Sequence, residues 1–110
     1  MAGWYELGMS RDGQFKFVLK ADNGDTILTS ELYKSKASAE NGISSVRANC
    51  ATDARYDRKE ASNGQLYFNL KAANHQVIGS SKMYASAAAR DAGIASVMAN
   101  GGSSTVQDLT

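Results

Sequence analysis

The sequence repeats itself with an offset of 51 residues, and this duplication limits the possible folds more than any other feature. Residues 13–49 placed over residues 64–100 are identical at 18 of 37 positions, with no insertion or deletion. A repeat of this size is one supersecondary unit that needs a neighbour to bury its apolar side. We therefore expect a single domain, residues 1–110, made of two repeats at about 1–52 and 53–110.

Each copy has the pattern of three strands. Residues 15–19 alternate large apolar side chains with other residues, the period of a strand with one buried face, and residues 66–70 repeat the alternation. Another short segment, residues 4–7, aligns with residues 54–58. Dipeptides typical of hairpin turns lie next to the alternating segments: Asp12-Gly13, Asn23-Gly24 and Asn63-Gly64.

A helix is predicted after the strands of each copy. Ser35 and Ser86 are suited to be N-caps, because a hydroxyl can accept from the first free backbone N–H groups. The apolar stripe of the first helix has the width of a core-facing helix, and the second copy rebuilds it; in the first copy it comprises Ala39, Gly42, Ile43, Val46 and Cys50. A glycine in the middle of both helices indicates that each helix lies very close to the sheet.

The fold class predicted from these elements is α+β. Neither copy alone can cover both its helix and its strand edges, so the two are expected to share one antiparallel sheet with pseudo-two-fold symmetry and both helices on one face. The C-terminal segment, residues 105–109, aligns with the segment that follows the first helix. It is predicted to be a last short strand that completes the sheet.

Three linked motifs that occur twice carry a resemblance to a known family. They are G-x-F-x-F-x-L-K-A-x-N-G, S-x-x-Y-x-S and N-G-I-x-S-V, at Gly13–Gly24, Ser30–Ser35 and Asn41–Val46, and again at Gly64–His75, Ser81–Ser86 and Ala92–Val97. This frame resembles the YegP-like family of small, uncharacterised bacterial proteins. The resemblance implies a β-β-β-α unit used in tandem, with C-terminal elements exchanged between the repeats. It implies no activity, substrate or catalytic residue. One departure is His75, which replaces the expected turn glycine.

The composition excludes few partners by itself. Twelve basic residues nearly balance eleven acidic ones, and the pI of about 7.8 does not favour a nucleic-acid binder. The sequence shows no signal peptide and no apolar run of membrane-spanning length. The single cysteine, Cys50, fits a reducing compartment. A cytoplasmic monomer containing an internal pseudo-dimer is expected, with no membrane association.

No catalytic residue, metal site or cofactor is predicted. The only histidine, His75, lies in a predicted turn with no metal-ligating residues at a suitable spacing. Cys50 falls on the apolar stripe and is interpreted as a small buried hydrophobic residue. None of the glycine-rich phosphate-binding or nucleophile motifs is present.

One candidate site lies at the start of the second helix. Arg90 falls within the apolar stripe where the first copy has Ala39. Together with Tyr84 and Ser86 it could form an anion-binding corner, since free N–H groups at a helix N-terminus favour anions. The alternative is structural: Ser86 caps the helix, the tyrosine anchors the loop, and Arg90 extends its charge to water or meets an acid.

A second candidate is the sheet face that the helices leave open. Lys16 and Lys20 from one copy, with Tyr67 and Lys71 from the other, could lie on it, and lysines around an aromatic residue suit single-stranded nucleic acid. A solvated sheet face explains the same residues. The leading hypothesis is a non-enzymatic binding or interaction module whose symmetric surface or exposed strand edges contact a partner, either a protein or single-stranded nucleic acid. A single-stranded nucleic-acid binder comes second, and an anion-binding protein or enzyme at the second helix N-terminus third.

Overall fold

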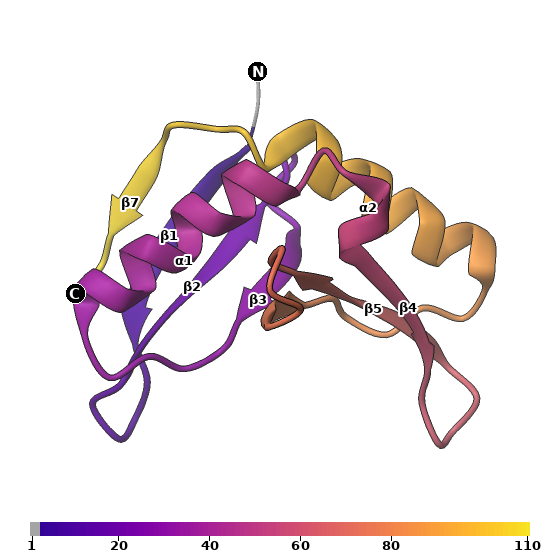
Figure 1. Ribbon diagram of the computed structural model, residues 1–110, viewed down its shortest axis with the longest axis horizontal. Helices are drawn as coiled ribbons and strands as arrows, with labels where there is room; N and C mark the ends of the chain where they lie inside the picture. Colours follow the sequence, from indigo (N-terminus) through magenta and orange to yellow (C-terminus); the bar gives the residue numbers. More distant parts are fainter. Residues whose placement is uncertain (1–2) are drawn as a thin grey trace.

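The computed structural model describes residues 3–110 and contains one seven-stranded sheet and two helices (Figure 1). The first copy supplies three strands and a helix, and the second copy repeats them before a last short strand. In chain order the elements are β1 (Trp4–Met9), β2 (Phe15–Lys20), β3 (Thr26–Ser30), α1 (Lys36–Asn49), the 3-10 turn η1 (Asp53–Arg55), β4 (Tyr56–Glu60), β5 (Leu66–Lys71), β6 (Val77–Ser80), α2 (Ala87–Asn100) and β7 (Val106–Asp108). The predicted α+β class and its two repeats are confirmed.

The order of strands in the sheet is β4-β5-β6-β3-β2-β1-β7. The two copies join where β3 and β6 pair antiparallel, with Thr29 opposite Ser80, so the pseudo-two-fold axis passes between these strands. The first five junctions along this order are antiparallel, as expected, whereas β7 pairs parallel to β1. The difference arises because β1 already occupies the antiparallel position beside β2, which leaves only its outer edge for the C-terminal strand.

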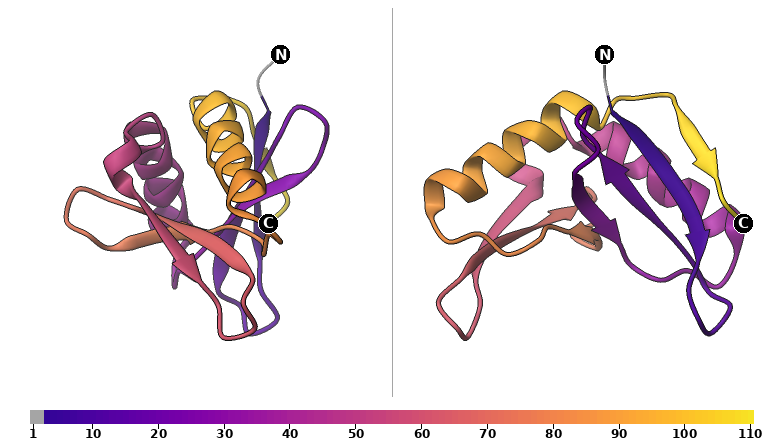
Figure 2. Two further views of the ribbon diagram at one scale, coloured as in Figure 1. Left: turned by 90° about the vertical axis from the view of Figure 1, so that its right-hand side faces the viewer. Right: turned by 180° about the vertical axis from the view of Figure 1, so that it is seen from behind.

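Both helices cover the same face of the sheet, as predicted (Figures 1 and 2). The core between the helices and the sheet contains two equivalent aromatic pairs. In the first copy the Phe17 ring is stacked on Tyr33 with centroids 6.3 Å apart, and in the second Phe68 is stacked on Tyr84 at 6.4 Å. Phe17 and Phe68 are both 0% exposed, so the alternation read from the sequence does mark the buried face.

The duplicated S-x-x-Y-x-S motif performs the same structural tasks in both copies. The Ser30 hydroxyl accepts from Phe17 N and donates to Glu31 O, which ties the end of β3 to β2, and Ser81 does the same in the second copy. Ser35 caps α1 by accepting from Ser38 N at 3.1 Å. The predicted N-caps are therefore present.

The helix glycines lie against the tyrosines of this motif. A Cβ added at Gly42 would be 2.7 Å from the Tyr33 hydroxyl and 2.8 Å from Cε2 of Phe17, and one at Gly93 would be 2.3 Å from the Tyr84 hydroxyl. The close approach expected from the sequence thus has a specific cause. Each helix crosses the ring of the tyrosine that precedes it.

The helix C-termini meet near the pseudo-two-fold axis, and a tyrosine from a first strand binds each one. Tyr5 of β1 donates to the carbonyl of Gly101 after α2, and Tyr56 of β4 donates to the carbonyl of Cys50 after α1, both at 2.6 Å. Cys50 is 3% exposed, as a small buried residue should be. The two hydrogen bonds join each helix to the strand that begins the other side of the sheet.

Candidate functional site

The face of the sheet opposite the helices is continuous across both copies. Directly paired residues share a face, so the strand register defines a row across all seven strands: Gln107, Glu6, Val18, Thr29, Ser80, Asn69 and Asp57. In β1 to β6 the row alternates with the buried residues of each strand, whereas all three residues of β7 are exposed. We call this surface the open face.

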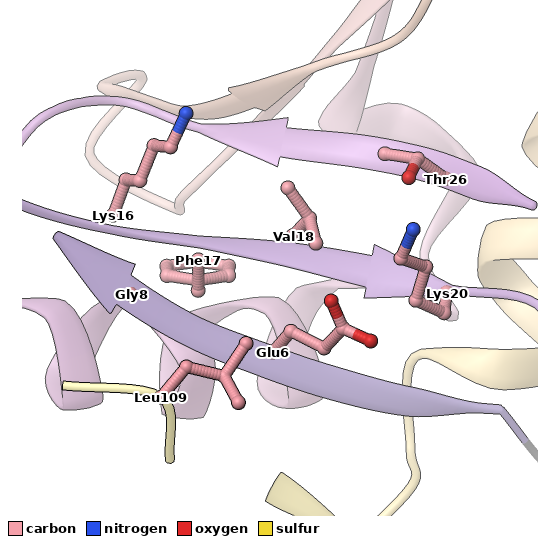
Figure 3. Close-up of a pocket in the computed structure, with 8 residues that line it drawn as sticks. All are labelled: Glu6, Gly8, Lys16, Phe17, Val18, Lys20, Thr26 and Leu109. Carbon is pink, nitrogen blue, oxygen red and sulfur yellow. The ribbon is translucent and has the colours of Figure 1, made fainter. Parts of the chain in front are cut away.

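The four residues predicted for a sheet-face site all lie on the open face. Lys16 and Lys20 flank Val18 on β2, and Tyr67 and Lys71 flank Asn69 on β5, two positions away in each case. The lysines of β2 border a hollow of about 260 Å³ (Figure 3). The structure therefore brings Lys16 and Lys20 to one place, and puts Tyr67 and Lys71 on the other half of the same face.

The two halves of the open face differ in whether their lysines form ion pairs. On the second half, the Asp57 carboxylate lies 3.1 Å from the Lys71 ammonium and 3.3 Å from that of Lys59. Hydrogen bonds from Lys71 first, and then from Lys59, hold the pKa of Asp57 below its usual value. Lys16 and Lys20 make no ion pair with any residue between 3 and 110. The first half therefore offers two unpaired ammonium groups.

Trp4 belongs to this surface, although the sequence analysis did not select it. It pairs with Lys20 across the β1–β2 junction, and its indole N–H donates to Glu6 at 2.9 Å. The signal was present in the sequence, because Trp4 and Glu6 alternate with the buried Tyr5 and Leu7. It required knowing that residues 4–9 form a strand antiparallel to β2.

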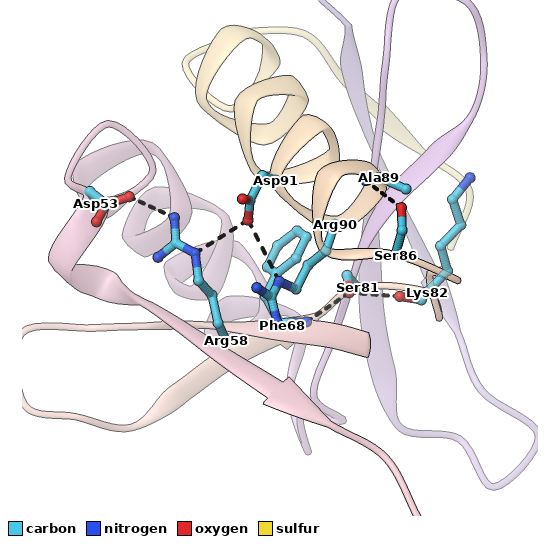
Figure 4. A network of polar contacts seen from close by, with 9 residues as sticks. All are labelled: Asp53, Arg58, Phe68, Ser81, Lys82, Ser86, Ala89, Arg90 and Asp91. Atoms are coloured by element: carbon cyan, nitrogen blue, oxygen red, sulfur yellow. Dashed lines mark hydrogen bonds and ion pairs between the residues drawn. The ribbon is translucent and has the colours of Figure 1, made fainter. Parts of the chain in front are cut away.

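The structure does not assemble the predicted corner of Tyr84, Ser86 and Arg90. The Ser86 hydroxyl accepts from Ala89 N at 3.1 Å as the N-cap, and the Tyr84 hydroxyl lies against Gly93. Figure 4 shows the guanidinium of Arg90 turned toward Asp91, away from Ser86. The predicted residues thus contact different neighbours.

Arg90 belongs to a charged cluster between β4 and α2. Its Nε lies 3.6 Å from the Asp91 carboxylate, and the same carboxylate is 3.4 Å from Nε of Arg58, whose Nη2 lies 2.9 Å from Asp53 (Figure 4). The Nε of Arg90 is buried and has no hydrogen-bond partner within the described residues. Two guanidinium groups are therefore balanced by two carboxylates.

The equivalent place in the first copy is apolar because β7 flanks it. Leu7 takes the position of Arg58 there, and Ala39 takes that of Arg90. Leu7 and Ala39 are almost fully buried. Asp108 of β7 lies opposite Leu7 and forms an ion pair with Lys36 at the start of α1. The second copy has no strand outside β4. Its long arginine side chains cover the core with their methylene groups, and the side chain of Arg58 remains 35% exposed but that of Arg90 only 15%.

We expect replacement of Arg90 by methionine to change the free energy of unfolding by less than about 1 kcal/mol, in the stabilising direction. Methionine keeps an unbranched stem but removes a buried donor that has no partner. Urea unfolding would measure the change. Arg58→Met is the matched control, with an expected loss of about 0.5 kcal/mol because its ion pairs are exposed. A larger loss for Arg90→Met than for the control would contradict this explanation.

Residues 3–110 contain no group of three or more His, Cys, Asp or Glu side chains placed to hold a metal ion. Neither helix in this part of the chain is long and apolar enough to cross a membrane.

The chain matches the profile described as Domain of unknown function (DUF1508) twice, at residues 10–57 and 61–108. It is 68% identical to the UPF0339 protein YegP of Escherichia coli K12 over 110 residues, covering 100% of both chains. It is 64% identical to a UPF0339 protein of Acinetobacter baylyi, covering 100% of this chain and 99% of that one. The expected resemblance to YegP is confirmed.

Two solution NMR structures are also similar to this one. The E. coli yegP structure, titled as a protein of unknown function, has a TM-score of 0.95 and 68% identity, covering 100% of this chain and 95% of that chain. A UPF0339 protein of Shewanella oneidensis has a TM-score of 0.94 and 62% identity, covering 100% and 93%. The two profile matches each begin before β2 or β5 and end in the strand after the helix.

Proposed function

The chain belongs to the DUF1508 family, whose function is unknown, and we propose that it is a small non-enzymatic binding module that uses the open face of its sheet. The observation that carries the proposal is the pair Lys16 and Lys20, two unpaired ammonium groups beside a hollow on a face that no helix covers. Charged groups held without a partner in the same chain are available to one outside it. On the other side of the sheet, the two helices pack over the core.

The shape of the open face suits an extended partner. Seven strands about 4.8 Å apart give a surface roughly 29 Å wide, measured along the sheet. Its ammonium groups and its aromatic residues, Trp4 and Tyr67, lie on the same side. Lysines can bind phosphates while bases stack on aromatic rings. Among extended polymers, this chemistry favours single-stranded nucleic acid.

The balanced charge of the whole chain predicts weak binding with a moderate salt dependence. The open face has four lysines, Lys16, Lys20, Lys59 and Lys71, and the last two share the Asp57 carboxylate, so together they would neutralise about three phosphates. Each contact with a single strand contributes about −0.7 to the slope of log affinity against log salt, so the expected slope is about −2.

We expect Lys16→Ala/Lys20→Ala to weaken binding of a fluorescent single-stranded oligonucleotide at least about fivefold at low salt, and to reduce the slope by about 1.4. Fluorescence anisotropy over a range of salt concentrations measures both. The matched control is Lys36→Ala/Lys82→Ala, which removes the same charge from outside the open face and should leave the slope unchanged. Equal weakening by both pairs, or no binding by the wild type, would reject nucleic acid as the partner.

A further inference from the structure

The two copies differ where the tyrosine of the S-x-x-Y-x-S motif meets solvent on the helix side. In the second copy the ammonium of Lys82 lies over the ring of Tyr84, 6.0 Å from its centroid. In the first copy Glu31 stands at the position of Lys82, and Tyr33 at that of Tyr84. One copy thus provides a cation for its own tyrosine, and the other provides an acid in the same place.

A hollow of about 250 Å³ lies beside Tyr33 in the first copy. It is bounded by α1, by the loop before α1 and by the start of β6, and its floor includes Val77 and Ile78. The residues with polar side chains that line it are Glu31, Tyr33, Ser38, Asn41, Ser45, Asn74 and Gln76. Most are neutral groups that can accept a hydrogen bond.

The charges around the two tyrosines show what the hollow lacks. In the second copy Lys82 is accompanied by Asp25, whose charge adds to the effect of burial in raising the pKa of Tyr84. In the first copy the place of Asp25 is taken by Gln76, and Glu31 adds to burial in raising the pKa of Tyr33. Glu31 makes no ion pair with any residue between 3 and 110. Lys82 and Asp25 give the second copy a cation and an anion, whereas Glu31 is the one charged residue among those that line the hollow in the first copy.

We propose that the hollow beside Tyr33 binds a small organic cation, an alkylammonium ion, in the place that the Lys82 side chain takes in the second copy. The Glu31 carboxylate would be the counter-ion, the Tyr33 ring would offer its negative face, and the rim would accept the N–H groups. The apolar floor suits a short alkyl chain such as the stem of lysine. An anion is disfavoured by Glu31, and the site is independent of the open face because it lies on the helix side of the sheet.

The expected affinity is low, because the carboxylate is exposed and the ring is half-buried. Exposed ion pairs and exposed cation–π contacts are both weak, so the dissociation constant should be on the order of 1–10 mM. NMR chemical shifts measure binding in this range. The probe is n-butylammonium chloride titrated into the full-length 15N-labelled protein, with 1-butanol and sodium butyrate as isosteric controls at matched ionic strength.

We expect n-butylammonium to give saturable shifts at the amides of Tyr33, Asn41 and Gln76. The two controls should give none that saturate. Shifts of equal size and saturation with 1-butanol would overturn the proposal, because they would show a hollow that selects for the alkyl chain and not for the charge. An absence of saturable shifts up to about 100 mM amine would also overturn it, since this is at least tenfold above the expected dissociation constant.

Reciprocal substitutions between the copies test the comparison directly. Glu31→Lys should place an internal ammonium over Tyr33 and weaken amine binding at least tenfold, whereas Glu40→Lys makes the same charge change at an exposed position of α1 and should weaken it less than twofold. Lys82→Glu should create a second site, seen as new saturable shifts at Tyr84. Both exchanged residues lie in solvent-accessible loops, and the dispersion of the spectra verifies folding. Unchanged binding in Glu31→Lys would overturn the assignment.

Discussion

Replacing Gly42 with alanine is expected to lower the free energy of unfolding by about 2 kcal/mol, although alanine is the better helix former. The added methyl would lie 2.7 Å from the Tyr33 hydroxyl and 2.8 Å from Cε2 of Phe17. Phe17 is fully buried against the rest of the core and cannot move away. Overpacking typically costs about 1–3 kcal/mol, and two such close contacts exceed the gain of about 1 kcal/mol in helix propensity.

Urea unfolding with an unchanged denaturant slope is the appropriate measurement. Gly102→Ala is the control, because a Cβ there would meet no atom within 4 Å, and its effect should stay within about 0.5 kcal/mol. The second copy offers a further comparison. The three atoms nearest to a Cβ at Gly93 all belong to Tyr84, so Tyr84→Phe should recover part of the loss caused by Gly93→Ala. A Gly42→Ala variant as stable as the wild type would show that the helix can move away from the ring.

The second large effect is a loss of stability in alkaline solution, which we attribute to Tyr5 and Tyr56. Burial, and next the neighbouring Cys50, raise the pKa of both phenols far above the ordinary value. In the unfolded chain these groups lose their protons near pH 10. Above that pH the unfolded state binds fewer protons than the folded state, so stability falls by about 1.4 kcal/mol per pH unit for each tyrosine. Below it, these two groups make no difference to the pH dependence.

These two tyrosines should therefore leave the free energy of unfolding independent of pH near neutrality. Above pH 10 they should lower it by roughly 3 kcal/mol per pH unit. Tyr56→Phe should halve the contribution of this pair to the slope. At pH 7 the same variant should be less stable by about 1–2 kcal/mol, because the Cys50 carbonyl loses its hydrogen bond. Cys50, Tyr33 and Tyr84, whose pKa values burial also raises, will leave a residual slope.

Urea unfolding between pH 7 and 11.5 would measure both effects. The variants Tyr5→Phe and Tyr56→Phe serve as controls for each other, since each tyrosine makes the same hydrogen bond to the opposite helix. If the slope above pH 10 were the same in the wild type and in the double variant, ionisation of this pair could not be its cause.

Most of the secondary structure could be predicted because its signals are local. A serine accepts from the N–H three residues later, and a turn residue must adopt a positive φ whatever lies around it. Even His75, which replaces the expected turn glycine, adopts the backbone conformation that its turn requires. His75 has a φ of 70°, the left-handed conformation that Gly24 adopts at the same position of the first copy.

The candidate sites were less predictable than the elements that carry them. Strand alternation was enough to place Lys16, Lys20, Tyr67 and Lys71 on one face, because a side chain's face depends only on the position parity within its strand. Lys71 differs from the two lysines of β2 because it forms an ion pair with Asp57 of β4. The alternation within one strand cannot predict this pair, since it depends on a residue of another strand. The importance of the difference between Glu31 and Lys82 could not be predicted from the sequence for a similar reason: the hollow beside Tyr33 is bounded by segments of both copies.

The duplicated sequence by itself determined the repeat, the strands, the helix caps and the buried aromatic residues, since each is set by contacts within one copy. Only the tertiary structure decided how the symmetry is broken. Both β1 and β7 could have paired with β2 at the edge of the first copy. β1 takes that place because a short turn joins it to β2 and it buries Tyr5 and Leu7. β7 is left to pair outside β1, parallel and largely exposed. That competition between two strands for one edge is decided by burial. It explains why Ala39 lies at an edge that β7 covers, whereas Arg90 lies beside β4, the strand at the other edge of the sheet.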